Sequence, residues 1–189
     1  MGQPQEMIED LKRENEHFFE AFKKESDRGL ALVAAEFFDA TLERLLRARF
    51  SASLQKRPKL IKPLFDGFGP LSTFSAKISI SYAIDLLQDW MVSDLDLIRR
   101  IRNEFAHSLE SKTFRDPEIS RMVGQLASFS RAVKSIEKPD RPKIPEPPTR
   151  TRFVWACTRT GALLQAKVVV LASDAPGEMK HSFMINPEL

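Results

Sequence analysis

The strongest helical pattern in the chain is Leu30-Ala-Leu-Val-Ala-Ala-Glu-Phe-Phe-Asp-Ala-Thr-Leu-Glu-Arg-Leu-Leu-Arg-Ala-Arg-Phe50. Its apolar side chains recur every three or four residues, which is the period of one face of an α-helix. The preceding Ser26-Asp-Arg-Gly29 breaks this pattern and offers an N-cap. We therefore predict an amphipathic helix that ends near Phe50 and buries its apolar face.

Further helices are predicted on both sides of this stretch. Apolar residues with helical spacing indicate one helix from Ile8 to about Phe22. Ser72 or Thr73 can cap another that runs to about Gln88, although alternation with period two in its second half also allows a strand. Helical spacing favours the helix. The segment 57–70, between the helix that ends near Phe50 and the one capped by Ser72 or Thr73, contains prolines and glycines and is predicted as a connector.

Two more helices complete the predicted bundle. Ser93, with acidic residues in the following turn, is expected to start a helix that ends at His107. Asp116-Pro117 opens the last one, which continues to about Ile136, because Asp is a good N-cap and Pro is tolerated at the first helical position. Residues 1–136 are therefore predicted to form an all-α domain of about five helices.

The remainder of the chain changes character after Ile136. Residues 138–148 contain five prolines, so we predict an extended linker over residues 137–150. Beyond it, three runs rich in β-branched and aromatic residues alternate with Gly-containing turns, at 152–157, 166–171 and 179–185. These runs predict a small antiparallel β appendage over residues 151–189.

Composition limits the classes of protein to which the chain can belong. Its 189 residues are 42% hydrophobic and 29% charged, which is typical of a globular protein. Cys157 is the single cysteine, so no disulfide forms within the chain. With only three histidines in addition, at positions 17, 107 and 181, a zinc cluster within one chain is not expected. No apolar run is long enough to span a membrane and the N-terminus lacks a secretory pattern, so we expect a cytoplasmic protein with no metal and no cofactor.

Charge is unevenly distributed along the chain. Residues 1–25 carry seven acidic and four basic side chains, a net charge of −3, whereas residues 43–63 carry seven basic side chains and one acidic, a net charge of +6. This basic stretch is either a solvated helix end or a landing surface for nucleic acid or an acidic protein partner. The candidate binding residues in it are Arg44, Arg47, Arg49, Lys56 and Arg57.

The residues with the clearest chemical potential lie at the end of the predicted 93–107 helix, in Arg99-Arg-Ile-Arg-Asn-Glu-Phe-Ala-His107. Asn103 and His107 are one turn apart on the same side of the helix. Histidine can donate or accept a proton near neutral pH, and the guanidinium of Arg102 can bind two phosphate oxygens at once. Arg102, Asn103 and His107 are therefore candidates for phosphodiester cleavage, and Arg99 and Arg100 for holding a nucleic-acid backbone or a partner. A histidine at a helix C-terminus is equally compatible with a structural role.

Arg102-Asn103 followed by His107 resembles the Arg-x(4–6)-His signature of the HEPN superfamily. More narrowly, three blocks in order, at 25–33, 64–77 and 94–107, resemble the mannitol operon repressor family. The resemblance covers about residues 5–136. It implies a HEPN-like helical bundle, and for the superfamily it implies a homodimer in which the two motif helices face each other.

The resemblance also implies competing functions. The narrow family implies a cytoplasmic regulatory protein, and the chain shows no helix-turn-helix, so action through a protein or RNA partner is favoured over direct DNA reading. In catalytic HEPN proteins the matching residues would make His107 the general acid or base, Arg102 the phosphate stabiliser and Asn103 a positioning group of a metal-independent endoribonuclease. A structural dimerisation module is the third alternative. The first of these is our leading hypothesis.

Overall fold

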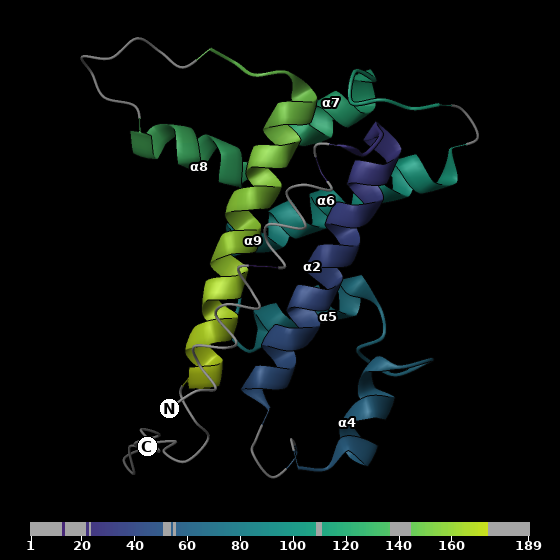
Figure 1. Cartoon of the computed structure of the whole chain (residues 1–189), viewed down its shortest axis with the longest axis vertical. Helices are drawn as coiled ribbons and strands as arrows, with labels where there is room; N and C mark the ends of the chain where they lie inside the picture. The colour runs from purple at the N-terminus through teal and green to yellow at the C-terminus, as the bar shows by residue number, and fades with distance from the viewer. Residues whose placement is uncertain are drawn as a thin grey trace, which may run out of the picture.

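The computed structural model describes residues 24–50, 56–108, 111–136 and 145–173, together with Arg13, Phe22 and Leu54. These residues form an all-helical fold without a strand, which confirms the all-α class predicted for the bundle but not the β appendage predicted after it. The predicted helix from Ile8 to Phe22 lies almost entirely outside the described residues. The helices, shown in Figure 1, are α2 (Asp27–Arg49), α4 (Pro58–Phe65), α5 (Phe74–Ala83), α6 (Asp89–His107), α7 (Pro117–Gly124), α8 (Ala127–Ile136) and α9 (Thr149–Ser173).

Helix α2 is the central element and matches the prediction from its sequence. Ser26 is its N-cap, and the Ser26 side chain accepts a hydrogen bond of 3.0 Å from the amide of Gly29. The apolar stripe of α2 is buried against α5, α6 and α9. Burial against three helices explains why the apolar stripe is broad, while the charged residues of α2 lie on the remaining face.

Helix α5 begins at its predicted cap, whereas helix α6 begins earlier than predicted. Thr73 caps α5 as predicted, because its hydroxyl accepts a hydrogen bond of 3.2 Å from the amide of Ala76. Helix α6 begins at Asp89, before the predicted start at Ser93. Ser93 instead donates its hydroxyl to the carbonyl of Asp89, one turn earlier, at 3.1 Å, which is a bond typical of serine inside a helix.

The predicted helix from Pro117 to Ile136 is two helices, and this part of the prediction was wrong. Helix α7 ends at Gly124 and α8 begins at Ala127. The break is stabilised by Asp94 of α6, whose carboxylate accepts hydrogen bonds from the amides of Ala127 and Ser128 at 2.7 and 2.8 Å. A distant side chain therefore caps α8, and continuous helical periodicity in sequence does not reveal such a cap.

The predicted connector 57–70 contains helix α4, which the sequence did not indicate. Pro58 stands in its first turn, where proline is tolerated, and Pro63 lies inside this short helix. Ile61 and Phe65, one turn apart, are buried, so packing outweighs the low helix propensity of the segment. Gly69 approaches the end of α4 so closely that a Cβ atom there would lie 2.2 Å from the carbonyl oxygen of Pro63. Only glycine fits this turn.

The predicted strands at 152–157 and 166–171 were wrong, because both runs belong to helix α9. The buried residues of α9 recur with helical spacing and form one stripe. A stripe that packs on α2, α7 and α8 decides the structure here, whereas β-branched residues favour a strand only weakly and according to context. Residues 145–148 have no regular structure, and the predicted strand 179–185 lies outside the described residues. The stripe consists of Phe153, Ala156, Cys157, Thr160, Leu164, Gln165 and Val168.

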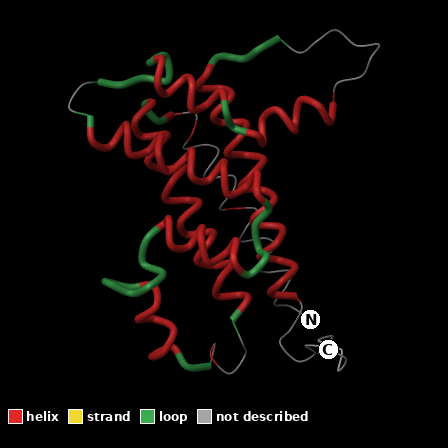
Figure 2. Tube along the Cα trace, turned by 180° about the vertical axis from the view of Figure 1, so that it is seen from behind, coloured by secondary structure: helices red, strands yellow, loops and turns green. Residues whose placement is uncertain are grey.

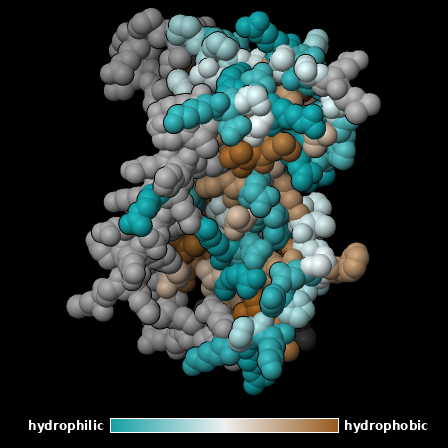
Figure 3. All heavy atoms as spheres, turned by 45° about the vertical axis from the view of Figure 1, so that its right-hand side comes forward, coloured by the Kyte–Doolittle hydropathy of each residue, from teal (hydrophilic) through white to brown (hydrophobic). Residues whose placement is uncertain are grey.

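Helices α2 and α9 run side by side along the molecule, and α6 crosses them (Figures 1 and 2). Helix α4 lies at one end, beyond the C-terminus of α2. The described part of the face in Figure 3 is largely hydrophilic, with apolar groups in small patches. None of the helices in the described residues is both long and apolar enough to cross a membrane.

Candidate functional site

The C-terminal half of α6 positions the motif residues. Ile98, Ile101 and Phe105 anchor the buried face of the helix, which directs the polar residues between them toward solvent. Nη1 of Arg102 donates a hydrogen bond of 3.0 Å to Oδ1 of Asn103. His107 is the last residue of the helix and is exposed. The three candidate catalytic residues are thus accessible on one helix.

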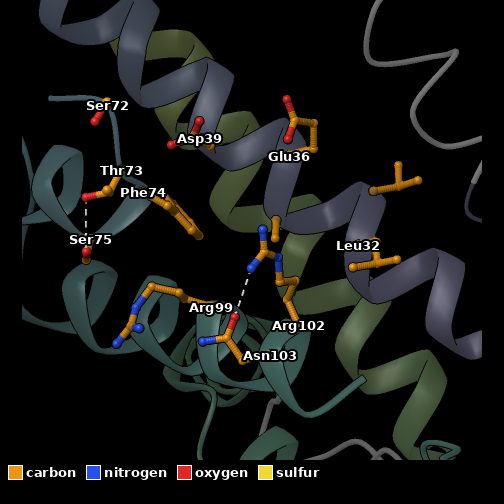
Figure 4. Close-up of a pocket in the computed structure, with 12 residues that line it drawn as sticks. Leu32, Glu36, Asp39, Ser72, Thr73, Phe74, Ser75, Arg99, Arg102 and Asn103 are labelled. Atoms are coloured by element: carbon orange, nitrogen blue, oxygen red, sulfur yellow. Dashed lines mark hydrogen bonds between the residues drawn. The ribbon is translucent and has the colours of Figure 1, made fainter. Parts of the chain in front are cut away.

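A pocket of about 620 Å³ lies where α2, α5 and α6 meet (Figure 4). Arg99, Arg102 and Asn103 form its wall on α6, and Glu36 and Asp39 form the opposite wall on α2. The structure therefore brings two of the three candidate catalytic residues, and Arg99, into one pocket. His107 is not among the lining residues. Apolar side chains and the start of α5 complete the lining with Leu32, Val33, Ala35, Ser72, Thr73, Phe74 and Ser75.

An ion network lies at the acidic wall of this pocket, and the sequence analysis missed it. The ammonium of Lys77, a side chain with 4% exposure, lies 2.8 Å from Asp39 Oδ2 and 3.2 Å from Glu43 Oε2. Glu43 also accepts hydrogen bonds from Arg47. Asp39 and Glu43 are four residues apart on α2, a spacing visible in the sequence, but the position of Lys77 on α5 depends on tertiary packing.

The ion network also alters the ionisation of Glu43. Partial burial by itself raises the pKa of the Glu43 carboxyl, but hydrogen bonds from Arg47 and Lys77 and the charges of both side chains outweigh it. The net effect is a pKa below the ordinary value of a glutamate. Glu43 is therefore held in its charged form, and the network of two carboxylates and two cations is neutral as a whole.

The predicted basic stretch is brought to one end of the molecule, away from the pocket. Arg44, Arg47 and Arg49 lie near the C-terminus of α2, and Lys56 and Arg57 precede α4. Arg47 is engaged, since its guanidinium lies 4.3 Å from the centre of the Phe65 ring and pairs with Glu43. The other four side chains are exposed. Arg100 is exposed on α6 and does not line the pocket.

We define the basic arm as residues 56–70, which comprise α4 and the turn after it. Its cations Lys56, Arg57, Lys59 and Lys62 are all exposed. The arm also exposes two apolar side chains, Leu60 at 52% and Phe68 at 109% of full accessibility. Phe68 stands at the tip of the turn Asp66-Gly-Phe-Gly-Pro70, where Gly67 adopts a positive φ of 60°. The sequence analysis placed Phe68 in a connector and did not predict its exposure.

Asp27 and Arg28, from the first block of the family resemblance, are structural residues. Nη2 of Arg28 donates a hydrogen bond of 3.0 Å to the carbonyl of Ala106, at the end of α6. Asp27 accepts a hydrogen bond of 2.9 Å from the amide of Phe114 and pairs with Arg150 of α9. These contacts hold the motif end of α6 against the N-terminus of α2.

Cys157 is a packing residue. It is fully buried on α9, and burial, assisted by the negative charge of Asp94, raises the pKa of the Cys157 thiol well above its ordinary value. A thiol in this environment stays protonated and is a poor nucleophile. Within the described residues no group of three or more histidine, cysteine or acidic side chains is arranged to hold a metal ion.

Two solved structures of bacterial proteins have a similar fold. A possible transcriptional regulator, YggD, from Shigella flexneri 2a aligns with a TM-score of 0.59 at 14% identity and covers 83% of this chain and 98% of that one. MtlR in the structure of the MtlR–HPr complex from Escherichia coli aligns with a TM-score of 0.53 at 21% identity and covers 84% and 98%. Both are likenesses of fold.

Sequence comparison identifies the family. The mannitol operon repressors of Escherichia coli strain K12 and strain CFT073 are each 25% identical to this chain over 99 residues, which cover 52% of this chain and 51% of those proteins. This chain thus matches about half the length of these relatives. The mannitol repressor family as a whole matches residues 14–153, from before α2 into α9. The wider resemblance to the HEPN superfamily stays a prediction. This chain belongs to the mannitol repressor family.

Proposed function

We propose that the chain is a regulatory protein of the mannitol repressor family that acts by binding a protein partner at the basic arm. The observation that carries this proposal is Phe68, an aromatic side chain fully exposed at the tip of a turn, in an arm whose preceding residues include four exposed cations. Aromatic residues that stand in solvent are typical anchors of protein interfaces, and they often contribute most of the binding energy.

A partner bound at the basic arm would bury the side chain of Phe68. Burying a phenylalanine side chain contributes roughly 1.5–3 kcal/mol. The exposed cations of the same arm would attract a partner with an acidic surface and raise the association rate. The turn is also held in place: the amide of Leu71 donates to the carbonyl of Leu64 at 2.8 Å, and Phe65 is buried beside Arg47. A partner would therefore meet a preorganised anchor, which reduces the entropy lost on binding.

The comparisons support a protein partner and provide a first candidate. The Escherichia coli MtlR whose fold resembles this chain was solved in a complex with HPr. We infer that an HPr protein of the same cell is the partner to test first. The predicted homodimer belongs to this proposal as well, and the molar mass in solution, measured by light scattering, tests it.

The test compares the wild type with two substitutions in a titration against purified HPr. Phe68→Ser removes the anchor without touching the core. Val170→Ser is the matched control, because Val170 is an apolar side chain, 58% exposed, on α9, which is far from the basic arm in sequence. We expect Phe68→Ser to weaken binding at least about tenfold and Val170→Ser to leave it unchanged. Equal binding by wild type and Phe68→Ser would refute the proposed surface, and no binding by the wild type would refute this partner.

A metal-independent endoribonuclease is the second candidate. The observation in its favour is that Arg102, in contact with Asn103, and His107 are both exposed on one helix, where an RNA phosphate could reach them. His107 does not line the pocket with Arg102 and Asn103. A catalytic site that uses all three residues would therefore have to be completed by a second protomer of a dimer. Incubation of wild type and His107→Ala with RNA in a chelator, scored for cyclic-phosphate ends, separates the two candidates. Cleavage by the wild type alone would establish the nuclease.

A further inference from the structure

We propose that the pocket between α2, α5 and α6 binds a small polyhydroxylated anion, of the class of sugar phosphates and sugar acids. This inference goes beyond partner binding and does not depend on it, because the pocket and the basic arm share no residue. The pocket volume of about 620 Å³ is in the range usual for small-molecule sites.

The wall formed by α6 suits an anionic group. Arg99 and Arg102 are three residues apart, so their side chains lie one turn apart on the same side of the helix, and both line the pocket (Figure 4). Each is only partly occupied in the described residues: Arg99 pairs through Nε with Asp96, and Arg102 donates through Nη1 to Asn103. A guanidinium has five N–H donors, so both retain donors for a phosphate or a carboxylate.

The start of α5 adds to the same preference. Phe74 and Ser75, the first two residues of this ten-residue helix, line the pocket next to the cap residue Thr73. The first amides of a helix have no partner within the helix, and they carry the positive end of its dipole. The hydroxyl of Ser75 lies 3.3 Å from that of Thr73 and provides a further group that can donate or accept. An anion placed between α5 and α6 would meet donors from both helices.

The wall formed by α2 suits hydroxyl groups. Asp39 lines the pocket with a side chain that is 25% exposed, and its carboxylate is neutralised by Lys77 through Oδ2. A carboxylate accepts hydrogen bonds and donates none, so it suits a ligand group that donates. Because Lys77 already balances the charge, a neutral hydroxyl suits this carboxylate better than an ammonium. Glu36, exposed one turn away on α2, provides a second acceptor.

The dimensions of the pocket fit a ligand with charge at one end and hydroxyls along its length. Leu32 and Asp39 are seven residues apart on α2, which corresponds to roughly 10 Å along the helix axis. Leu32, Val33 and Phe74 provide apolar surface that can contact the C–H groups of a sugar. A bare phosphate would leave the α2 wall unused, and a neutral sugar would leave the arginines unused.

The test is calorimetric titration with five probes: glucose 6-phosphate, gluconate, glucose, inorganic phosphate and serine. We expect both hydroxylated anions to bind, and at least about tenfold more tightly than either glucose or phosphate. Arg102→Gln should weaken binding of the best anion by about tenfold or more. Arg100→Gln is the matched control, since Arg100 is an exposed arginine on the same helix outside the pocket, and it should bind as the wild type does.

Other results would overturn the proposal. Binding of inorganic phosphate as tight as that of glucose 6-phosphate would show a simple anion site, and equal losses in Arg100→Gln and Arg102→Gln would show general electrostatic attraction. Binding of the zwitterion serine in preference to the sugar anions would overturn the assignment of hydroxyls to the Asp39 wall. Absence of binding at millimolar probe would refute the site. The titration with HPr tests Phe68 of the basic arm, and the titration with small probes tests the pocket. Failure of one proposal therefore does not affect the test of the other.

Discussion

Arg150 of α9 forms an ion pair with Asp27 of α2, and this contact joins residues 123 positions apart in the chain. The same guanidinium donates to the carbonyls of Phe22 and Glu25 at 3.1 and 2.7 Å, on the approach to α2. Arg150 thus ties the start of α9 to the segment that enters α2. Asp27 also holds the amide of Phe114, so one carboxylate links three parts of the chain.

Replacement of Asp27 by Ala should lower the free energy of unfolding by roughly 1–3 kcal/mol. The change removes the partner of Arg150 and leaves the amide of Phe114 without its acceptor. Urea denaturation followed by circular dichroism measures this loss. Asp66→Ala is the control: its pair with Lys62, at 3.9 Å, is exposed, and such pairs contribute about 0–1 kcal/mol. Equal stability of the two variants would show that Asp27 is not a structural link.

Replacement of Lys77 by Met should destabilise the protein by roughly 3 kcal/mol. It leaves the carboxylates of Asp39 and Glu43 close together without the cation between them. The expected value is at the low end for removal of one partner of a buried ion pair, because both carboxylates retain some contact with solvent. Lys62→Met, at an exposed position, serves as the comparison in the same denaturation experiment. If Lys77→Met unfolds at the same urea concentration as Lys62→Met, the ion network does not stabilise the fold.

Asp94 should make the protein less stable as the pH rises from mildly acidic values. Burial raises the pKa of the Asp94 carboxyl above the ordinary 3.8, although hydrogen bonds from Ser128 and Ala127 and the charge of Arg131 partly oppose this. The native state therefore binds this proton more tightly than the unfolded state. The Asp94 contribution is fully present below pH 3.8 and is lost as the pH rises through the native pKa.

Asp94→Asn tests this linkage, because asparagine does not titrate; it can accept only one of the two amide hydrogen bonds, but that loss does not vary with pH. The free energy of unfolding of the wild type minus that of the variant should fall as the pH rises from 3.8 through the native pKa of Asp94. The opposite contribution of Glu43, whose pKa is lowered, is common to both proteins and cancels in the difference. A difference that stays flat, or rises with pH, would contradict the assignment.

Gly161→Ala should destabilise the packing of α9 on α2 by about 1–3 kcal/mol. A Cβ atom at this position would lie 2.9 Å from Cε1 of Phe37, closer than side-chain carbon atoms normally approach. Gly124→Ala is the matched control, since nothing lies within 4 Å of a Cβ atom there. Thermal denaturation of both variants measures the effect. A Gly161→Ala protein that melts with Gly124→Ala would mean that α9 does not pack on α2 at this point.

The sequence predicts those elements whose signals are local. Helix α2, the Thr73 cap of α5 and the end of α6 at His107 follow from periodicity and capping residues near in the chain. The break between α7 and α8 does not, because its cap is Asp94, 33 positions from Ala127. Helix α9 was missed although its buried positions have helical spacing, because β-branched content was given more weight than the period.

The candidate site shows the same division between local and tertiary information. Arg99, Arg102 and Asn103 were identified from one short motif, and the structure places them in one pocket. The opposite wall, with Asp39 and its partner Lys77, depends on the packing of α2 against α5, and no spacing in the sequence indicates it. The exposure of Phe68 was not predictable either, because a phenylalanine beside two glycines is as compatible with a buried anchor as with an exposed one.

The most direct test of the proposed function is titration of the wild-type protein with purified HPr at two salt concentrations. If the cations of the basic arm attract the partner and Phe68 anchors it, HPr binds, and the affinity falls as salt rises from about 0.05 to about 0.5 M because exposed charges are screened. Binding that is absent at both concentrations, or that is equally tight at both, would contradict the account.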